Sequence, residues 1–215
     1  MIDGPGFLGF GPFALKWFEG LEANNEKAWY DANRATFEAE VKRPLLALLD
    51  VFAARRGGAV KVFRQNRDIR FSKDKRPYKT NTYGIVSSEG RLPFYASISA
   101  QGLSCGTGFY DPTKDRLAAL RAAIADEATG PDFEDALGRA EATGIERSGD
   151  ALATAPRGFA KDHPRIALLR HKSLLLIRRL PPKSTLDGRA PFDFALETWE
   201  ALAPAREWLE THAPA

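Results

Sequence analysis

The chain has 215 residues, with 31 Lys and Arg against 28 Asp and Glu, which gives a formal net charge of +3. This length is typical of a single domain whose core needs no disulfide bonds. One cysteine and three histidines exclude a disulfide framework and a thiolate zinc site, and they leave little for a histidine metal cluster. The longest apolar run, 173–180, is far shorter than the ~20 residues of a membrane span, and the chain starts without a signal-peptide pattern. We therefore expect one cytoplasmic domain over residues 1–215, with no metal and no membrane contact.

The first quarter of the chain is predicted to be helical. Apolar side chains recur at helical spacing over 12–21, and again over 26–52. Asn24 or Asn25 suits the N-cap of the second helix. Pro44 lies inside that helix, where it either kinks the helix or opens a new one. We expect at least two helices before the first strand.

Short strands joined by tight turns follow. Residues 93–100 alternate apolar and polar side chains, and Gln101-Gly102 is typical of a tight turn. The other strand candidates in this region are 59–64, 81–88 and 103–110. Strands that lie this close together in the sequence form an antiparallel meander.

The second half of the chain mixes helices with one further strand. Thr113 suits the N-cap of a helix, and another helix follows Pro131. Residues 173–180 have the strongest strand pattern, and Pro204 kinks or splits a last helix at 192–212. The order of the elements predicts an α+β fold: a mainly antiparallel sheet of about five strands, covered by N- and C-terminal helices.

Positive charge is concentrated in one segment. Residues 61–79 contain eight Lys or Arg and two Asp, a net charge of +6, whereas the rest of the chain has 23 basic against 26 acidic residues. A basic segment on a slightly acidic body indicates a local anion site rather than a surface coated for DNA. A solvated basic loop, balanced by the acidic region that follows, explains the same pattern equally well.

The basic segment has the composition of an anion-binding loop. Arg64, Arg67 and Arg70 recur at every third position, and Pro77 fixes extended or turn geometry. The arginine fork matches phosphate or carboxylate oxygens in pairs, and lysine adds point charge. The aromatic side chains of Phe71 and Tyr78 suit contact with a ring or an acyl chain of the ligand. We expect a small anionic, phosphorylated ligand to contact Arg67, Arg70, Lys73, Lys75, Arg76, Tyr78 and Lys79.

Two other interpretations of this segment stay open. In the first, Asp68 and Asp74 pair with the arginines and pin the loop to the sheet, without any ligand. In the second, the segment is an interaction module for an acidic partner or a nucleic acid backbone. Nucleic acid is the least favoured partner, because it should bring more basic charge elsewhere and aromatic residues on one exposed face.

Residues outside the segment are candidates for the same site. Asn25 and Arg34 would wall the pocket, although helix capping explains Asn25 as well. If the protein is an enzyme, a hydrolase that acts on phosphoesters suits the charge, with His163 as the base, Asp68 or Asp74 as the next choice, and Lys172 reaching the pocket. The Asp-His-Pro turn at 162–164 is equally a capping motif. Whether the protein is an enzyme, its cofactor and its oligomeric state stay undetermined.

Motifs spread over nearly the whole chain resemble a known pattern. The most specific is the block 70–79, and the others are 24–30 with Asn33-Arg34, 94–100, 106–112, 117–124, 158–159, 162–164 and 168–172. Together they resemble the bacterial and fungal family catalogued as domain of unknown function twenty-four sixty-one. The resemblance implies a single-domain α+β protein and no established activity.

The glycines and the cysteine of the predicted meander have structural interpretations rather than ligand-binding or catalytic ones. Gly102, Gly106 and Gly108 lack the strand–loop–helix context of a phosphate-binding fingerprint, so we expect strand bends there. Cys105 has no nearby histidine or lysine in the sequence, so we expect a small buried side chain rather than a nucleophile.

Overall fold

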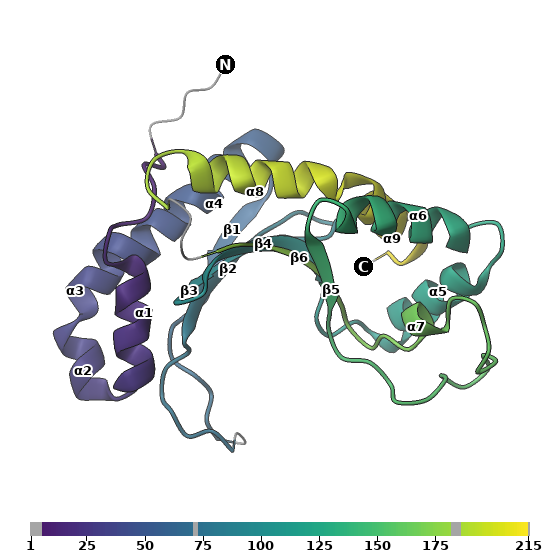
Figure 1. Cartoon of the computed structure of the whole chain (residues 1–215), viewed down its shortest axis with the longest axis horizontal. Coiled ribbons are helices and arrows are strands. Elements are labelled where there is room, and N and C mark those ends of the chain that lie inside the picture. Colours follow the sequence, from purple (N-terminus) through teal and green to yellow (C-terminus); the bar gives the residue numbers. More distant parts are fainter. Residues whose placement is uncertain (1–5, 71–72, 182–185, 215) are drawn as a thin grey trace. The chain divides into compact units, whose positions relative to one another are not determined.

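Six strands form one sheet in the computed structural model, which describes residues 6–70, 73–181 and 186–214 (Figure 1). The strand order among these residues is β1-β2-β3-β4-β6-β5. The strands are β1 (Ala59–Val62), β2 (Asn81–Ser87), β3 (Phe94–Ser99), β4 (Gly102–Phe109), β5 (Ile145–Ser148) and β6 (Leu174–Leu180). The α+β fold with an antiparallel sheet is therefore confirmed. The sixth strand is β5, a four-residue strand in which only Ile145 is buried.

Internal contacts divide the chain into two compact units. The first unit consists of residues 1–87, 94–105 and 179–197, and the second of residues 88–93, 106–178 and 198–215. The expectation of a single domain stays a prediction. Among the described helices, none combines the length and apolar character that crossing a membrane requires.

The first unit begins with consecutive helical segments. They are α1 (Ala14–Ala23), α2 (Lys27–Ala32), α3 (Arg34–Thr36), the π-helical η1 (Phe37–Lys42) and α4 (Arg43–Arg56). Pro44 lies in the first turn of α4, directly after η1, and Lys42 and Arg43 before it keep helical dihedral angles, so the proline marks the change from the π-helical to the α-helical segment. Helix α4 packs on β1, β2 and β3, and its Phe52 ring stacks on Phe94 of β3 at 3.8 Å.

The strand register decides which side chains of the first unit face α4. Tyr83 of β2 pairs with Ser97 of β3, and Gly84 pairs with Ala96. A Cβ added at Gly84 would lie 2.5 Å from the Leu49 side chain, so this face of the sheet touches α4. Because side chains alternate along a strand, Tyr83 and Ser97 point to the opposite face.

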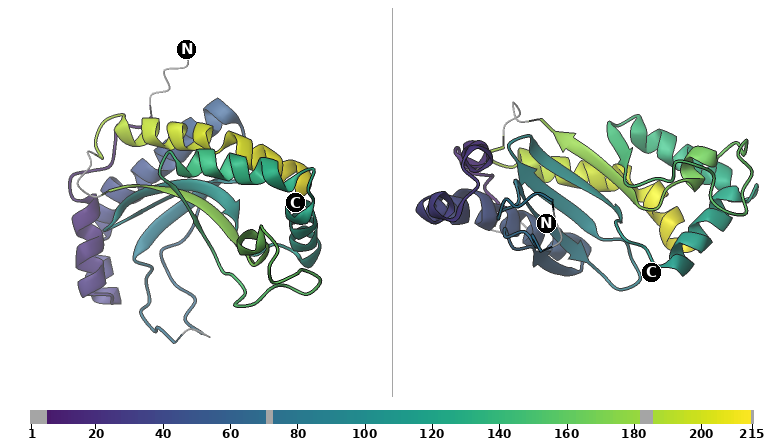
Figure 2. Two further views of the ribbon diagram at one scale, coloured as in Figure 1. Left: turned by 45° about the vertical axis from the view of Figure 1, so that its right-hand side comes forward. Right: turned by 90° about the horizontal axis from the view of Figure 1, so that it is seen from below.

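The second unit packs helices against β4, β5 and β6. Its helices are α5 (Lys114–Ala125), α6 (Gly130–Glu141), α7 (Ile166–Leu169) and α9 (Ala203–His212), and α8 (Ala190–Ala201) runs through both units (Figure 2). The Thr113 hydroxyl accepts a hydrogen bond from the Arg116 amide at 3.2 Å, which confirms the predicted cap. Pro204 falls in the first turn of α9, so it splits the last helix. The Phe133 ring stacks on Trp208 at 4.2 Å in the core of this unit.

The glycines of β4 allow a close approach to β6. A Cβ added at Gly106 would lie 2.0 Å from the Leu176 carbonyl oxygen, and one at Gly108 would lie 2.1 Å from that of Leu174. Gly108 also has a φ of +136°, which other residues rarely adopt. Cys105 is fully buried, and burial raises the pKa of its thiol far above the ordinary value. The prediction that Cys105 is buried is confirmed, and at Gly106 the close approach of β6, rather than a bend, is what requires glycine.

Candidate functional site: the basic arm between β1 and β2

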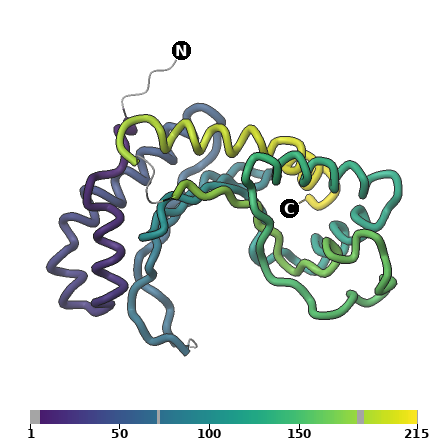
Figure 3. The backbone as a smooth tube through the Cα atoms, viewed as in Figure 1, coloured from purple at the N-terminus to yellow at the C-terminus, as the bar shows by residue number. Residues whose placement is uncertain are grey.

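The basic segment forms an extended arm, described over residues 63–70 and 73–80, that leaves the sheet between β1 and β2 (Figure 3). Its two sides pair with each other: the Arg67 amide donates to the Pro77 carbonyl at 2.8 Å, and the Lys79 amide donates to the Gln65 carbonyl at 2.9 Å. An isolated antiparallel bridge joins Asn66 to Tyr78. The arm therefore continues the antiparallel pairing of β1 and β2 beyond the sheet. Phe71 lies outside the described residues, so its expected role has no structural account.

Gln65 holds the base of the arm together. Its side chain is buried, and its amide nitrogen donates to the carbonyls of Lys79 and Asn81, the latter at 3.2 Å. Its amide oxygen accepts a hydrogen bond from the Thr82 hydroxyl at 2.6 Å. Gln65 is not recognisable from the sequence, because one neutral amide among many charged neighbours carries no pattern.

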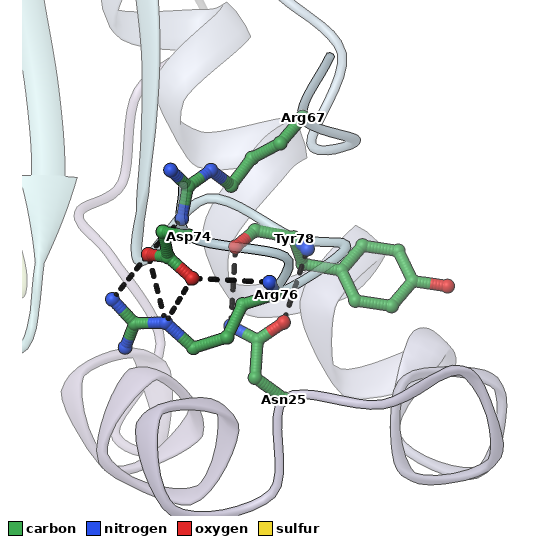
Figure 4. A network of polar contacts seen from close by, with 5 residues as sticks. All are labelled: Asn25, Arg67, Asp74, Arg76 and Tyr78. Carbon is green, nitrogen blue, oxygen red and sulfur yellow. Dashed lines mark hydrogen bonds and ion pairs between the residues drawn. The ribbon is translucent and has the colours of Figure 1, made fainter. Parts of the chain in front are cut away.

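Asn25 fastens the arm to the helical segments of the same unit (Figure 4). Its Oδ1 accepts from the Tyr78 amide at 3.0 Å, and its Nδ2 donates to the Tyr78 carbonyl at 3.1 Å. The Tyr78 ring is buried and stacks on Tyr30 of α2 at 4.2 Å. Asn25 and Tyr78, both expected at the site, are thus brought together by the fold.

The predicted capping role of the two asparagines is wrong. The N-cap of α2 is Glu26, and no side-chain hydrogen bond caps this helix. Asn24 donates its side-chain amide back to the Gly20 carbonyl at 3.1 Å, and Asn25 is turned to the arm. The contact with Tyr78, 53 residues further along the chain, takes precedence over the local cap, because it satisfies both polar atoms of the Asn25 side chain.

Asp74 lies between two arginines of the arm (Figure 4). It pairs with Arg67, and it accepts from the Arg76 side chain through Nη2 at 2.7 Å and from the Arg76 amide at 3.0 Å. The hydrogen bonds from Arg76, then those from Arg67, hold the pKa of this carboxyl far below its ordinary value. One carboxylate cannot neutralise two guanidinium groups, so this cluster keeps a net positive charge.

Asp68 forms a second pair in the arm. It accepts from Arg70 through Nε at 2.9 Å and Nη2 at 2.6 Å, a bidentate geometry, and also from the Arg70 amide. The side-chain hydrogen bonds from Arg70 lower the pKa of the Asp68 carboxyl. The arginine pairing expected of both aspartates is therefore present. A carboxylate with a lowered pKa is a weaker base at neutral pH, which is unfavourable for proton abstraction.

The lysines of the arm differ in their surroundings. Lys79 is half-buried: its Nζ donates to the Arg64 carbonyl at 2.8 Å, and burial lowers its pKa, assisted by the charge of Arg64. Lys75 is exposed and donates to the Ile69 carbonyl at 3.0 Å across the arm. Lys73 and the Arg64 side chain are exposed as well. The arm therefore presents several cations to solvent on a paired framework.

The remaining predicted site residues lie on other elements. Arg34 is exposed on α3, and its charge acts on Tyr30, whose pKa is raised by burial. His163 and Lys172 belong to the second unit. The His163 Nδ1 accepts a hydrogen bond from the Arg165 amide at 3.0 Å, and the Lys172 Nζ lies 3.9 Å from an Asp150 carboxylate oxygen. Both of these contacts are made within the second unit.

No cluster suited to a metal ion is found among the described residues, and one hollow of the first unit lies away from the arm. Across the described residues, no group of three or more His, Cys, Asp or Glu has an arrangement suited to a metal ion. A shallow hollow of about 410 Å³ lies instead over the start of the chain and α4, lined by Gly6, Leu8, Gly9, Ala39, Arg43, Pro44 and Ala47.

Comparison with models of protein families assigns the chain to a family. The model of the family described as conserved hypothetical protein (DUF2461) matches residues 13–208, and the chain belongs to this family. The match covers both the helical segments that hold the arm and the arm itself. None of the curated proteins compared with the chain matches it.

Proposed function

We propose that this DUF2461 protein binds a phosphate-bearing anionic ligand through the arm. The observation that carries the proposal is the cluster in which Asp74 pairs with both Arg67 and Arg76. The shared carboxylate orients both guanidinium groups and leaves the cluster positive. Since the groups are held before a ligand arrives, less conformational entropy is lost when it binds. Arginine forks in this state suit phosphate oxygens.

Binding is better supported than hydrolysis. A general base that works near neutral pH has a pKa near 7, but pairing with arginine lowers the pKa values of Asp68 and Asp74. His163, the other candidate base, uses its Nδ1 to accept a backbone hydrogen bond in the second unit. The charge of the arm therefore acts in recognition, and the two aspartates act as positioning residues for the arginines.

The exposure of the cations favours an extended partner over a small enclosed one. The side chains of Arg70 and Arg76 are 76% and 52% exposed. A small ligand held by exposed cations alone gains little, because water screens each contact. A polymeric anion contacts several cations at once and releases counterions, so its affinity falls steeply with added salt. This is the observation that favours an interaction module as the second candidate function.

The test compares two arginines that differ in position and share the same type of partner. Arg76→Gln removes a cation of the arm, and Arg189→Gln removes an exposed arginine that pairs with Asp193 in α8. Binding of pyrophosphate, ATP and long-chain polyphosphate is measured by calorimetry at low salt. We expect Arg76→Gln to weaken binding severalfold and Arg189→Gln to leave it unchanged. Absence of binding to all three ligands in the wild type, or an equal loss in both variants, would overturn the proposal.

A further inference from the structure

The face of the sheet opposite α4 carries a row of aromatic rings. Phe63 follows β1, and its amide donates to the Tyr83 carbonyl of β2 at 3.0 Å, so the two residues are neighbours across the strands. Their rings stack at 4.6 Å, and the Tyr83 ring lies 5.9 Å from that of Tyr95 on β3. All three side chains are half-buried. The right-hand view of Figure 2 looks onto the strands from below. The row Phe63, Tyr83 and Tyr95 is called the aromatic row below.

Cations accompany the aromatic row. The Lys61 Nζ lies 5.0 Å from the centre of the Phe63 ring, and the Lys79 Nζ lies 4.7 Å from that of Tyr83. Lys79 also belongs to the arm, so the row and the arm form one continuous surface of the first unit. A hydrogen bond of 2.9 Å from Asn81 Nδ2 to Ser97 Oγ adds polar groups to the same face.

We propose that the aromatic row and the arm together bind single-stranded nucleic acid. The inference rests on the proposed function, because the arm would hold the backbone phosphates. The bases would stack on the row, since every base offers a planar face to an aromatic side chain. Sheet faces with aromatic residues and nearby cations recognise single strands in this way. In a duplex the base faces are already stacked, so the row distinguishes a single strand from a duplex.

The strand register bears on one of the two reasons that make nucleic acid the least favoured partner from the sequence. Such a partner should bring more basic charge elsewhere in the chain and aromatic residues on one exposed face, and the aromatic row bears on the second of these. Phe63 follows β1, and Tyr83 and Tyr95 lie on β2 and β3; they are 20 and 12 residues apart in the sequence, and only the pairing of the chain brings them together. Charge complementarity supports the same partner, because Lys61 and Lys79 lie beside the rings that would hold the bases.

The test uses the full chain and four polyanions. Fluorescence anisotropy measures the binding of a twelve-nucleotide single strand, as RNA and as DNA, and of the DNA duplex of the same length; long-chain polyphosphate is the ligand without rings. The variants are Tyr83→Leu, which removes the ring, Tyr83→Phe, which keeps it, and Phe13→Leu, which removes an exposed ring at the N-cap of α1 as the matched control. Circular dichroism and thermal unfolding check that each variant is folded.

We expect loss of the Tyr83 ring to weaken the binding of single strands and not that of polyphosphate. Loss of one stacked base corresponds to between about fivefold and about a hundredfold weaker binding. The affinity of Tyr83→Leu should therefore fall at least fivefold for the single strands and little for polyphosphate. Tyr83→Phe and Phe13→Leu should bind like the wild type. If Tyr83→Leu does not fold, Tyr95→Leu takes its place with the same expectation.

Two outcomes would overturn the inference, and they differ in what they say about the arm. If polyphosphate, duplex and single strands bind alike and Tyr83→Leu changes nothing, the aromatic row is not a base-stacking surface, while anion binding by the arm stands. If the wild type binds none of these polyanions, the proposed function fails together with the inference. A preference for RNA over DNA, or the reverse, would support the inference and identify the sugar that is recognised.

Discussion

Single amide side chains fix the position of the arm. Asn25 and Gln65 carry no charge. Asn25 pairs with the amide and the carbonyl of Tyr78 through both ends of its side-chain amide, and Gln65 donates to the carbonyls of Lys79 and Asn81 and accepts from the Thr82 hydroxyl. A substitution that removes such a partner destabilises the folded protein, because a buried backbone group is then left without a hydrogen bond and water cannot replace it. The orientation of the charged residues therefore depends on neutral ones that a charge-based analysis passes over.

Asn25→Ala should destabilise the protein by about 1–2 kcal/mol. The substitution leaves the amide and the carbonyl of buried Tyr78 without the bonds of 3.0 and 3.1 Å that they make now. The matched control is Asn24→Ala, in which an exposed neighbour loses one bond to Gly20 and should change stability by less than about 0.5 kcal/mol. Urea unfolding of both variants measures the difference. Equal effects would contradict the bridging role of Asn25.

The carboxyl of Asp74 should make the stability of the wild type depend on pH. Its pKa is lowered in the folded protein, so the stabilisation by Arg76 and Arg67 is fully present above the unfolded value of about 4. This stabilisation is lost as the pH falls below about 4 towards the folded value. Unfolding free energies of the wild type and of Asp74→Asn, measured from pH 7 to pH 2, should differ by a constant amount above pH 5 and converge below pH 4. A difference that grows as the pH falls would show that the pair does not act as described.

Local sequence signals predict where several helices start, but they do not predict the irregular elements. Pro44 and Pro204 lie in the first turns of α4 and α9, where a residue without an N–H is tolerated, and the Thr113 hydroxyl caps α5. The π-helical turn η1 and the short strand β5 carry no such signal, since tertiary contacts rather than periodicity define them. The candidate site divides in the same way: composition alone indicates the arm, but the roles of Gln65 and of the aromatic row need the register between strands.

Close packing of β4 on β6 should make one glycine irreplaceable. Gly106→Ala places a Cβ 2.0 Å from the Leu176 carbonyl oxygen, so the two strands must separate. We expect a loss of about 3 kcal/mol or more, as for other overpacked sites. The control is Gly138→Ala on the exposed face of α6, where a Cβ meets nothing within 4 Å and should stabilise the helix by roughly 0.5–1 kcal/mol. Thermal unfolding midpoints that shift in opposite directions would confirm the contrast, and a tolerated Gly106→Ala would contradict it.

At the scale of the whole molecule, the distribution of charge matters more than its sum. The net charge is only +3, but residues 61–79 carry +6 and the rest of the chain −3. A field of this kind concentrates anions at the arm, and it is weakened by salt beyond a Debye length of about 8 Å at physiological ionic strength. Two variants with the same net charge should therefore bind polyanions differently when the changed residues lie in different places.

Elution from immobilised heparin tests this expectation. Lys73→Glu with Lys75→Glu reverses two exposed charges of the arm, and Lys114→Glu with Lys161→Glu reverses two exposed charges of the second unit. Each replacement lowers the charge by two, so both double variants have a formal net charge of −1 instead of +3. If the arm is the anion-binding element, the arm variant should elute at much lower salt than the control, because the cations that contact the polymer are lost. Elution of both variants at the same salt would mean that net charge alone governs the binding, and the arm would then have no special role in recognising anions.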